Sequence, residues 1–86
     1  MQPIRDLLSK IMWDPNENPE LYSVFYMDRV KNRLIEVTFE DIISISENFM
    51  LIARDDEQVD IPLHRVKEVR KEEKLIWQRP KSEADG

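Results

Sequence analysis

Residues 21–39, LYSVFYMDRVKNRLIEVTF, contain the pattern that decides the fold. In Tyr22–Met27 and again in Leu34–Phe39, every second side chain is large and apolar. Alternation with a period of two places these side chains on one face of a β-strand. Asp28–Asn32 separates the two runs and carries the charged and polar residues typical of loops. The stretch therefore predicts two antiparallel strands joined by a short loop.

The residues before this stretch follow a helical period instead. Apolar side chains in Ile4–Met12 recur at intervals of three and four residues, as in an amphipathic helix. Pro3 suits the first helical position, whereas Pro15 disfavours helical backbone at the preceding residue. We therefore expect one helix of about three turns, followed by a polar connector over Asp14–Glu20.

The sequence after Phe39 predicts further short strands separated by charged turns. Thr38, with Asp41 three residues later, is placed to cap a short helical turn. Pro62–Arg65 is predicted to form a tight corner. The predicted strands are Phe49–Ala53, Val59–Ile61, Val66–Lys71 and Lys74–Arg79. One helix followed by five or six strands indicates an α+β fold, in which the helix packs on a small antiparallel, partly barrel-like sheet.

Length and composition narrow the class of protein. The 86 residues suffice for one domain with a modest core, which we place at residues 1–79, with a disordered tail at 80–86. The chain has no cysteine, which excludes thiol catalysis, disulfides and thiolate zinc sites. No apolar run approaches the roughly 20 residues that span a bilayer, so we expect a cytoplasmic protein without membrane contact.

The charge is distributed unevenly along the chain. The formal net charge is −5 at pH 7, which argues against a general nucleic-acid binder. Residues 61–81, however, hold seven Lys or Arg against three Glu, a local charge of +4. The C-terminal third of the chain is therefore basic, although the whole molecule is acidic.

Few residues support catalysis. His64 is the only histidine, so mechanisms that need two imidazoles cannot be assembled within one chain. Gly86 is the only glycine, which excludes a glycine-rich phosphate loop. The acidic run at Asp55–Glu57 lacks the spacing of a calcium loop and is interpreted as a solvated turn. We expect no enzyme activity, no metal and no cofactor.

Several residues are candidates for binding, each with an alternative structural role. His64 and Arg65 can present donors to one phosphate, although His64 can equally bond a carbonyl and fix the corner. The rings of Trp13, Trp77 and Tyr26 can stack on unpaired bases or belong to the core. Asp14 and Asp28 can orient arginines, and Asp14 can alternatively be a turn or cap residue ahead of Pro15.

Four segments of the chain resemble an archaeal family: LSKIMWDP at 8–15, YMDR at 26–29, IPLHRV at 61–66 and IWQR at 76–79. The chain resembles the RNA cyclic-group-end recognition domain over about residues 4–79. The resemblance implies a non-catalytic module that recognises RNA termini bearing a cyclic or terminal phosphate. It also implies an RNA ligase or phosphoesterase as partner, because the domain occurs fused to such enzymes in larger proteins.

Carried over residue by residue, the resemblance suggests a binding site. The phosphate would be contacted by Arg29, His64, Arg65, Arg79 and Lys10. A base would stack on Trp13, Trp77 or Tyr26, and the arginines would be oriented by Asp14 and Asp28. The sequence departs from the family pattern at Phe25, where glycine is usual, and at Leu63, where tryptophan is common.

Two other functions remain open at this point. The chain can be a protein-interaction module that assembles onto an RNA-processing enzyme through an exposed strand edge or helix face. It can also be an enzyme that uses His64 with a carboxylate such as Asp14 or Asp28. A module touching about three phosphates of a single strand would show a log–log salt slope near −2, which is compatible with an acidic protein.

Overall fold

The computed structural model describes residues 3–79, so the tail predicted at 80–86 lies outside the described residues. The predicted helix is confirmed as α1 (Ile4–Trp13). The described strands are β1 (Tyr22–Asp28), β2 (Arg33–Thr38), β3 (Ile42–Ile45), β4 (Phe49–Arg54), β5 (Glu57–Pro62), β6 (Val66–Lys71) and β7 (Lys74–Gln78). Three short 3₁₀ turns, η1 (Pro19–Leu21), η2 (Phe39–Asp41) and η3 (Leu63–Arg65), connect them. The α+β class is confirmed, but residues 3–79 form seven strands rather than five or six.

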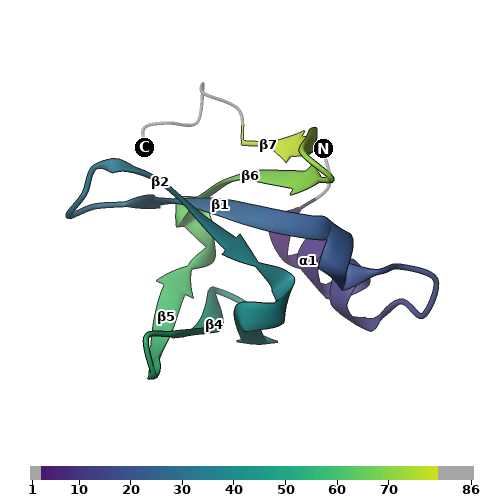
Figure 1. Cartoon of the computed structure of the whole chain (residues 1–86), viewed down its shortest axis with the longest axis horizontal. Coiled ribbons are helices and arrows are strands. Elements are labelled where there is room, and N and C mark those ends of the chain that lie inside the picture. Colours follow the sequence, from purple (N-terminus) through teal and green to yellow (C-terminus); the bar gives the residue numbers. More distant parts are fainter. Residues whose placement is uncertain (1–2, 80–86) are drawn as a thin grey trace.

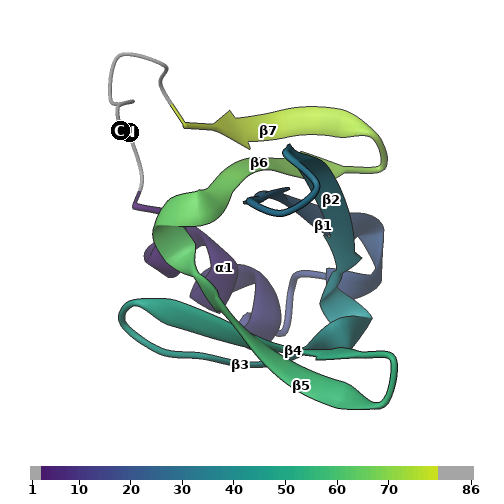
Figure 2. The same ribbon diagram turned by 90° about the vertical axis from the view of Figure 1, so that its left-hand side faces the viewer.

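The strands form two separate antiparallel sheets, so the predicted single barrel-like sheet is wrong. Their strand orders are β2-β1-β6-β7 and β3-β4-β5. Figure 2 shows the two sheets facing each other, with α1 lying between them on one side. The chain passes from one sheet to the other at η2, between β2 and β3, and at η3, between β5 and β6. These corners interrupt the backbone ladder, and the sheets therefore stay open.

The predicted hairpin at residues 22–39 forms one side of the larger sheet, with β2 at the edge and β1 between β2 and β6. Figure 1 shows β1 and β2 as a long pair whose loop projects at one end of the molecule. Val24 lies opposite Val37, and Tyr26 lies opposite Ile35, as the alternation requires. One core, shared by both sheets and the helix, is built from Leu8, Ile11, Tyr22, Val24, Tyr26, Val37, Phe39, Ile42, Met50, Ile52, Ile61, Leu63, Val66, Val69 and Trp77.

Strand β3 was not predicted, and β5 is longer than expected. β3 is only four residues long and buries Ile42 alone, so it shows no alternation of apolar side chains. β5 includes Glu57 and Gln58, whose exposed side chains had suggested a turn. The turn is in fact reduced to Asp55 and Asp56, and a charged run on an edge strand resembles a loop in sequence.

The hairpin turns place non-glycine residues in left-handed backbone. The φ angles are 50° at Asp55, 68° at Asp56, 51° at Glu72 and 73° at Glu73. Two-residue hairpin loops need positive φ and favour asparagine or glycine, because a Cβ atom is disfavoured there. A chain without internal glycine must therefore accept strain, which is greatest for the two glutamates.

We predict that Glu73→Gly stabilises the protein by about 1 kcal/mol, because it removes the Cβ penalty at a residue with φ 73°. The free energy of unfolding in urea measures the gain. Glu73→Ala is the matched control, since it removes the same charge but keeps the Cβ and should give no comparable gain. Equal stabilisation by both variants would assign the effect to charge and contradict the prediction.

The Tyr22 phenol makes the stability of the fold depend on pH in the alkaline range. Its hydroxyl donates a 2.6 Å hydrogen bond to Glu17 Oε1. This bond, together with burial and the Glu17 charge, raises the pKa of Tyr22 from 10.0 to about 12. The folded state thus favours the neutral phenol, so the contribution to stability is complete below pH 10 and is lost as pH rises toward 12.

We therefore predict that wild type loses stability more steeply than Tyr22→Phe between pH 10 and 12. Urea unfolding at several pH values in this window gives the free energy of unfolding of each protein as a function of pH. The difference between the two curves is free of the contribution of the lysines, because both proteins contain the same lysines. Parallel curves for the two proteins would show that the Tyr22 pKa is not raised.

Candidate functional site

A basic pocket of about 190 Å³ lies where the end of β1 meets η3 and the start of β6. Its lining residues are Met27, Arg29, His64, Arg65 and Lys67, and we call this set the basic pocket. Four of the five carry nitrogen donors, and none carries a carboxylate. Three of the residues predicted to bind phosphate, Arg29, His64 and Arg65, thus line one concavity.

The η3 corner positions two of these side chains. Leu63 is 5% exposed and anchors the corner in the core, while its N–H donates to the Asn48 carbonyl at 2.9 Å. The next residue, His64, is exposed, and Arg65 is half-buried at the pocket wall. In the described residues no hydrogen bond joins His64 to a carbonyl, so the alternative role as a fixing residue is not supported.

A β-bulge introduces Lys67 into the pocket. Phe25 pairs with Glu68 and Tyr26 pairs with Val66, which leaves Lys67 as the extra residue of β6. Bulges redirect side chains and commonly occur beside functional sites. Sequence reasoning missed Lys67 and Met27, because a bulge changes the register without changing the pattern of residue types.

Arg79 is not among the residues that line the basic pocket, and its guanidinium instead donates hydrogen bonds to the backbone around the η3 corner. Its Nε donates to the Val66 carbonyl at 3.0 Å, and its Nη2 donates to the Leu63 carbonyl at 3.0 Å. The guanidinium also lies 5.3 Å from the ring centroid of Trp77. These donors support the backbone on both sides of His64 and Arg65, and the role of Arg79 as a phosphate ligand stays a prediction.

The three aromatic residues predicted to stack do not gather at the basic pocket. Tyr26 is 4% exposed and its hydroxyl accepts a hydrogen bond from Arg54, while Trp77 is 8% exposed. Both belong to the core, so neither presents a ring face to a base. Trp13 is 74% exposed at the end of α1.

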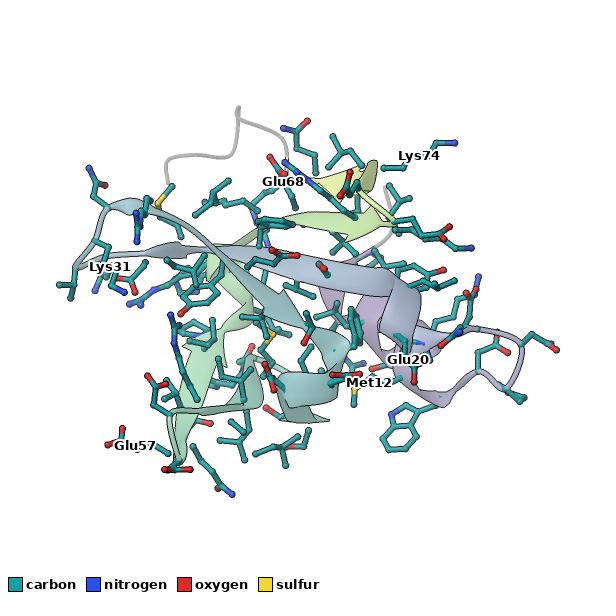
Figure 3. The ribbon with its side chains drawn as sticks, in the orientation of Figure 1. Met12, Glu20, Lys31, Glu57, Glu68 and Lys74 are labelled. Carbon is teal, nitrogen blue, oxygen red and sulfur yellow. The ribbon has the colours of Figure 1, made fainter. Side chains whose placement is uncertain are left out.

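The C-terminal end of α1 is remote from the pocket. Figure 3 places Lys31, in the loop that follows β1, at the left end of the molecule, and Met12 well away from it, right of the centre. Trp13 and Asp14 directly follow Met12, and Lys10 lies in the same last turn of the helix. These three predicted site residues are thus separated from the basic pocket.

The two aspartates predicted to orient arginines organise turns. Asp14 Oδ1 accepts from the Asn16 N–H at 2.8 Å. Asp28 Oδ1 accepts from the N–H groups of Val30 at 2.8 Å and Lys31 at 2.9 Å. The backbone hydrogen bond from Lys31, with a smaller one from Val30, lowers the pKa of Asp28. Asp28 therefore shapes the loop that carries Arg29 instead of binding its guanidinium.

A larger cavity of about 470 Å³ lies on the outer face of the four-stranded sheet. It is lined by Leu21, Ser23, Phe25, Glu36, Arg70, Glu72 and Glu73. Its one cation, Arg70, is paired with Glu68 at 2.7 Å and covers the Phe25 ring at 4.5 Å. Three carboxylates disfavour an anionic ligand, so the smaller basic pocket is the better site for phosphate.

Other kinds of site find no support within residues 3–79. No group of three or more potential metal-ligating side chains occurs there. In the same part of the chain, no helix has the length and apolar character needed to cross a membrane.

The fold and the pocket define a small α+β module with one localised basic concavity. A family model described as the MJ1316 RNA cyclic group end recognition domain matches residues 1–79. The chain therefore belongs to the RNA cyclic group end recognition domain family, as the sequence resemblance predicted.

Its relatives are archaeal proteins of the UPF0248 group. One from Metallosphaera sedula is 38% identical over 76 residues, covering 88% of this chain and 91% of the relative. One from Saccharolobus islandicus is 30% identical over 79 residues, covering 88% and 98%. One from Saccharolobus solfataricus is 30% identical over 79 residues, covering 88% and 95%. No solved structure matches the chain.

The support that Arg79 gives to η3 is testable. We predict that Arg79→Ala lowers the free energy of unfolding by about 2 kcal/mol, because the carbonyls of Leu63 and Val66 lose charge-assisted partners. Urea denaturation measures the loss. Arg5→Ala is the control, since its ion pair with Asp6 is exposed and 3.9 Å long, and it should have almost no effect. Equal stability of both variants would contradict the assigned role.

Proposed function

We propose that the chain is a non-catalytic module that binds the terminal phosphate of single-stranded RNA, including a cyclic one, during RNA processing or repair. The convergence of Arg29, His64, Arg65 and Lys67 on one concavity carries this proposal. The family description, which names RNA cyclic group ends, is consistent with it.

The cations of the basic pocket are available for a ligand. In residues 3–79 the ion pairs within 4.0 Å are Arg5–Asp6 and Arg70–Glu68, so no carboxylate neutralises the pocket. Guanidinium groups match the oxygens of a phosphate with two parallel hydrogen bonds, and an ammonium adds a point charge. The imidazole of His64 adds a further N–H donor.

The size of the pocket favours an end over a continuous backbone. A volume of about 190 Å³ holds a phosphate and part of a sugar, whereas an extended strand needs a long basic groove. The carboxylates of Glu36, Glu72 and Glu73 surround the neighbouring cavity and oppose such a groove there. A local anion site in a protein of net charge −5 is thus physically consistent.

The pocket composition also supports a binding role without chemistry. Hydrolysis or transfer at a phosphate needs a positioned acid and a base, and His64 is the only lining residue suited to either task near neutral pH. A module of this kind would act with enzymes such as an RNA ligase or a phosphoesterase, which would supply the reaction.

A second function, protein assembly, is favoured by exposed apolar side chains away from the pocket. Trp13 is 74% exposed, and Leu75 and Ile76 on the edge strand β7 are 45% and 41% exposed. Exposed apolar residues at a sheet edge are typical of surfaces that bind another protein. Both functions can coexist, since the surfaces do not overlap.

Fluorescence anisotropy with short RNAs ending in a 2′,3′-cyclic phosphate, a 3′-phosphate or a hydroxyl tests the proposal. We predict binding that depends on the terminal phosphate and that Arg65→Ala weakens by about tenfold, the loss of one charge-assisted contact. Affinities measured at two salt concentrations then distinguish the contact with the terminal phosphate from nonspecific electrostatic attraction to the RNA.

Lys74→Ala is the matched control, because Lys74 is an exposed cation that Figure 3 places far from Lys31 and the β1–β2 loop. It should leave affinity almost unchanged. No binding of any RNA at low salt, or equal losses in the two variants, would contradict RNA-end binding and favour the assembly function.

A further inference from the structure

An apolar surface adjoins the basic pocket on the outer face of the four-stranded sheet. Met27 lines the pocket, and Leu34 lies directly opposite it on β2. Leu34 is 36% exposed, and Met27 is partly exposed. Opposite residues on one sheet face have side chains in contact distance, so the pair extends the pocket with an apolar patch. We call this pair the Met27–Leu34 patch.

The next row of the same sheet face is acidic. Phe25 lies two residues before Met27, with Glu36 opposite it on β2 and Glu68 opposite it on β6. Two residues along a strand span about 6.6 Å. The Phe25 ring is covered by the Arg70 guanidinium at 4.5 Å, so it presents no free aromatic face on that side.

The acidic character continues toward the start of β1. Glu36 is exposed, and it borders the large cavity together with Glu72 and Glu73. A strand of RNA that entered from the basic pocket and followed β1 would therefore bring its phosphates toward carboxylates. At this range, within one Debye length, the repulsion is only partly screened.

From this arrangement we infer that the protein binds only the last nucleotide of an RNA. Its phosphate occupies the basic pocket, its base rests on the Met27–Leu34 patch, and Glu36 turns the preceding nucleotides away from the sheet, whereas Glu68 is paired with Arg70. The inference rests on the proposed function, and it specifies the length and chemistry of the ligand.

The nature of the patch determines base selectivity. Met27 and Leu34 offer apolar surface without the hydrogen-bond donors or strong acceptors that distinguish one base from another. A flexible thioether adapts to different ring shapes and contacts aromatic rings favourably. Purine and pyrimidine ends are therefore accepted with similar affinity.

The test compares a nucleoside 2′,3′-cyclic monophosphate with an RNA of about ten nucleotides that has the same end, by competition against a labelled RNA. The expected dissociation constants agree within about threefold, and the log–log salt slope of the longer RNA is about −0.7, the value of one contact. A longer RNA that binds more than about thirtyfold tighter, with a slope of −2 or steeper, would overturn the inference but leave RNA-end binding intact. Failure of both ligands would instead reject the proposed function.

Two isosteric variants test the acidic row. Glu36→Gln is expected to strengthen binding of the longer RNA several-fold and to steepen its salt slope by about 0.7, as one more phosphate contact forms. The affinity for the mononucleotide stays the same. Glu57→Gln, at the start of β5 and far from Glu68 in Figure 3, changes the net charge equally and should have no such effect. Equal behaviour of the two variants would show that Glu36 does not exclude the RNA chain.

The patch itself is tested by Leu34→Ala, which affects a partly exposed side chain and should leave the fold stable. It is expected to weaken mononucleotide and longer RNA by the same factor, with purine and pyrimidine ends affected alike. An unchanged affinity for both ligands would overturn the assigned role of the patch.

Discussion

The candidate site depends on the Arg79 guanidinium, which donates hydrogen bonds to the carbonyls of Leu63 and Val66. The η3 corner is where the chain leaves the three-stranded sheet and enters the larger one, so part of its backbone lies outside both ladders. Arg79, at the end of the last strand, supplies donors at this break. Burial of Leu63 fixes the corner from the other side, and His64 and Arg65 are then directed toward β1.

The basic side chains near the η3 corner are separated from the acidic side chains of the same sheet. The bulge in β6 and the loop after β1 bring Lys67 and Arg29 to the corner, while the glutamates of the hairpin turn and of β2 lie farther along the sheet. An acidic net charge and a local basic concavity therefore coexist. This separation underlies our proposal that the protein binds an RNA terminus and not an RNA backbone, because a terminus needs only one small basic concavity.

The sequence predicted the elements whose patterns are strong and local. The alternation in β1 and β2 and the helical period of α1 arise from burial of one face, and both are confirmed. β3 was missed because a four-residue edge strand with one buried side chain has no period. The barrel-like sheet was wrong because the corners at η2 and η3 separate the strands, and this depends on contacts far apart in sequence.

The candidate site shows the same division. Arg29, His64 and Arg65 were named from residue type, and the structure places them together; their binding role stays a prediction. Lys67 was missed because its position follows from a bulge. The hydrogen bonds of Arg79 to the Val66 and Leu63 carbonyls were not foreseen, because these partners lie 13 and 16 residues away. Residue type alone could not separate buried Tyr26 and Trp77 from exposed Trp13, since aromatic side chains serve both purposes.

Backbone amide shifts in an NMR titration with a short RNA ending in 2′,3′-cyclic phosphate test the central claim most directly. The account predicts that the largest changes occur at Arg29, His64, Arg65 and Lys67, and that residues at the end of α1 and on β7 stay unchanged. Changes centred on Trp13 or on Leu75 and Ile76 instead, or no changes at any residue, would contradict it.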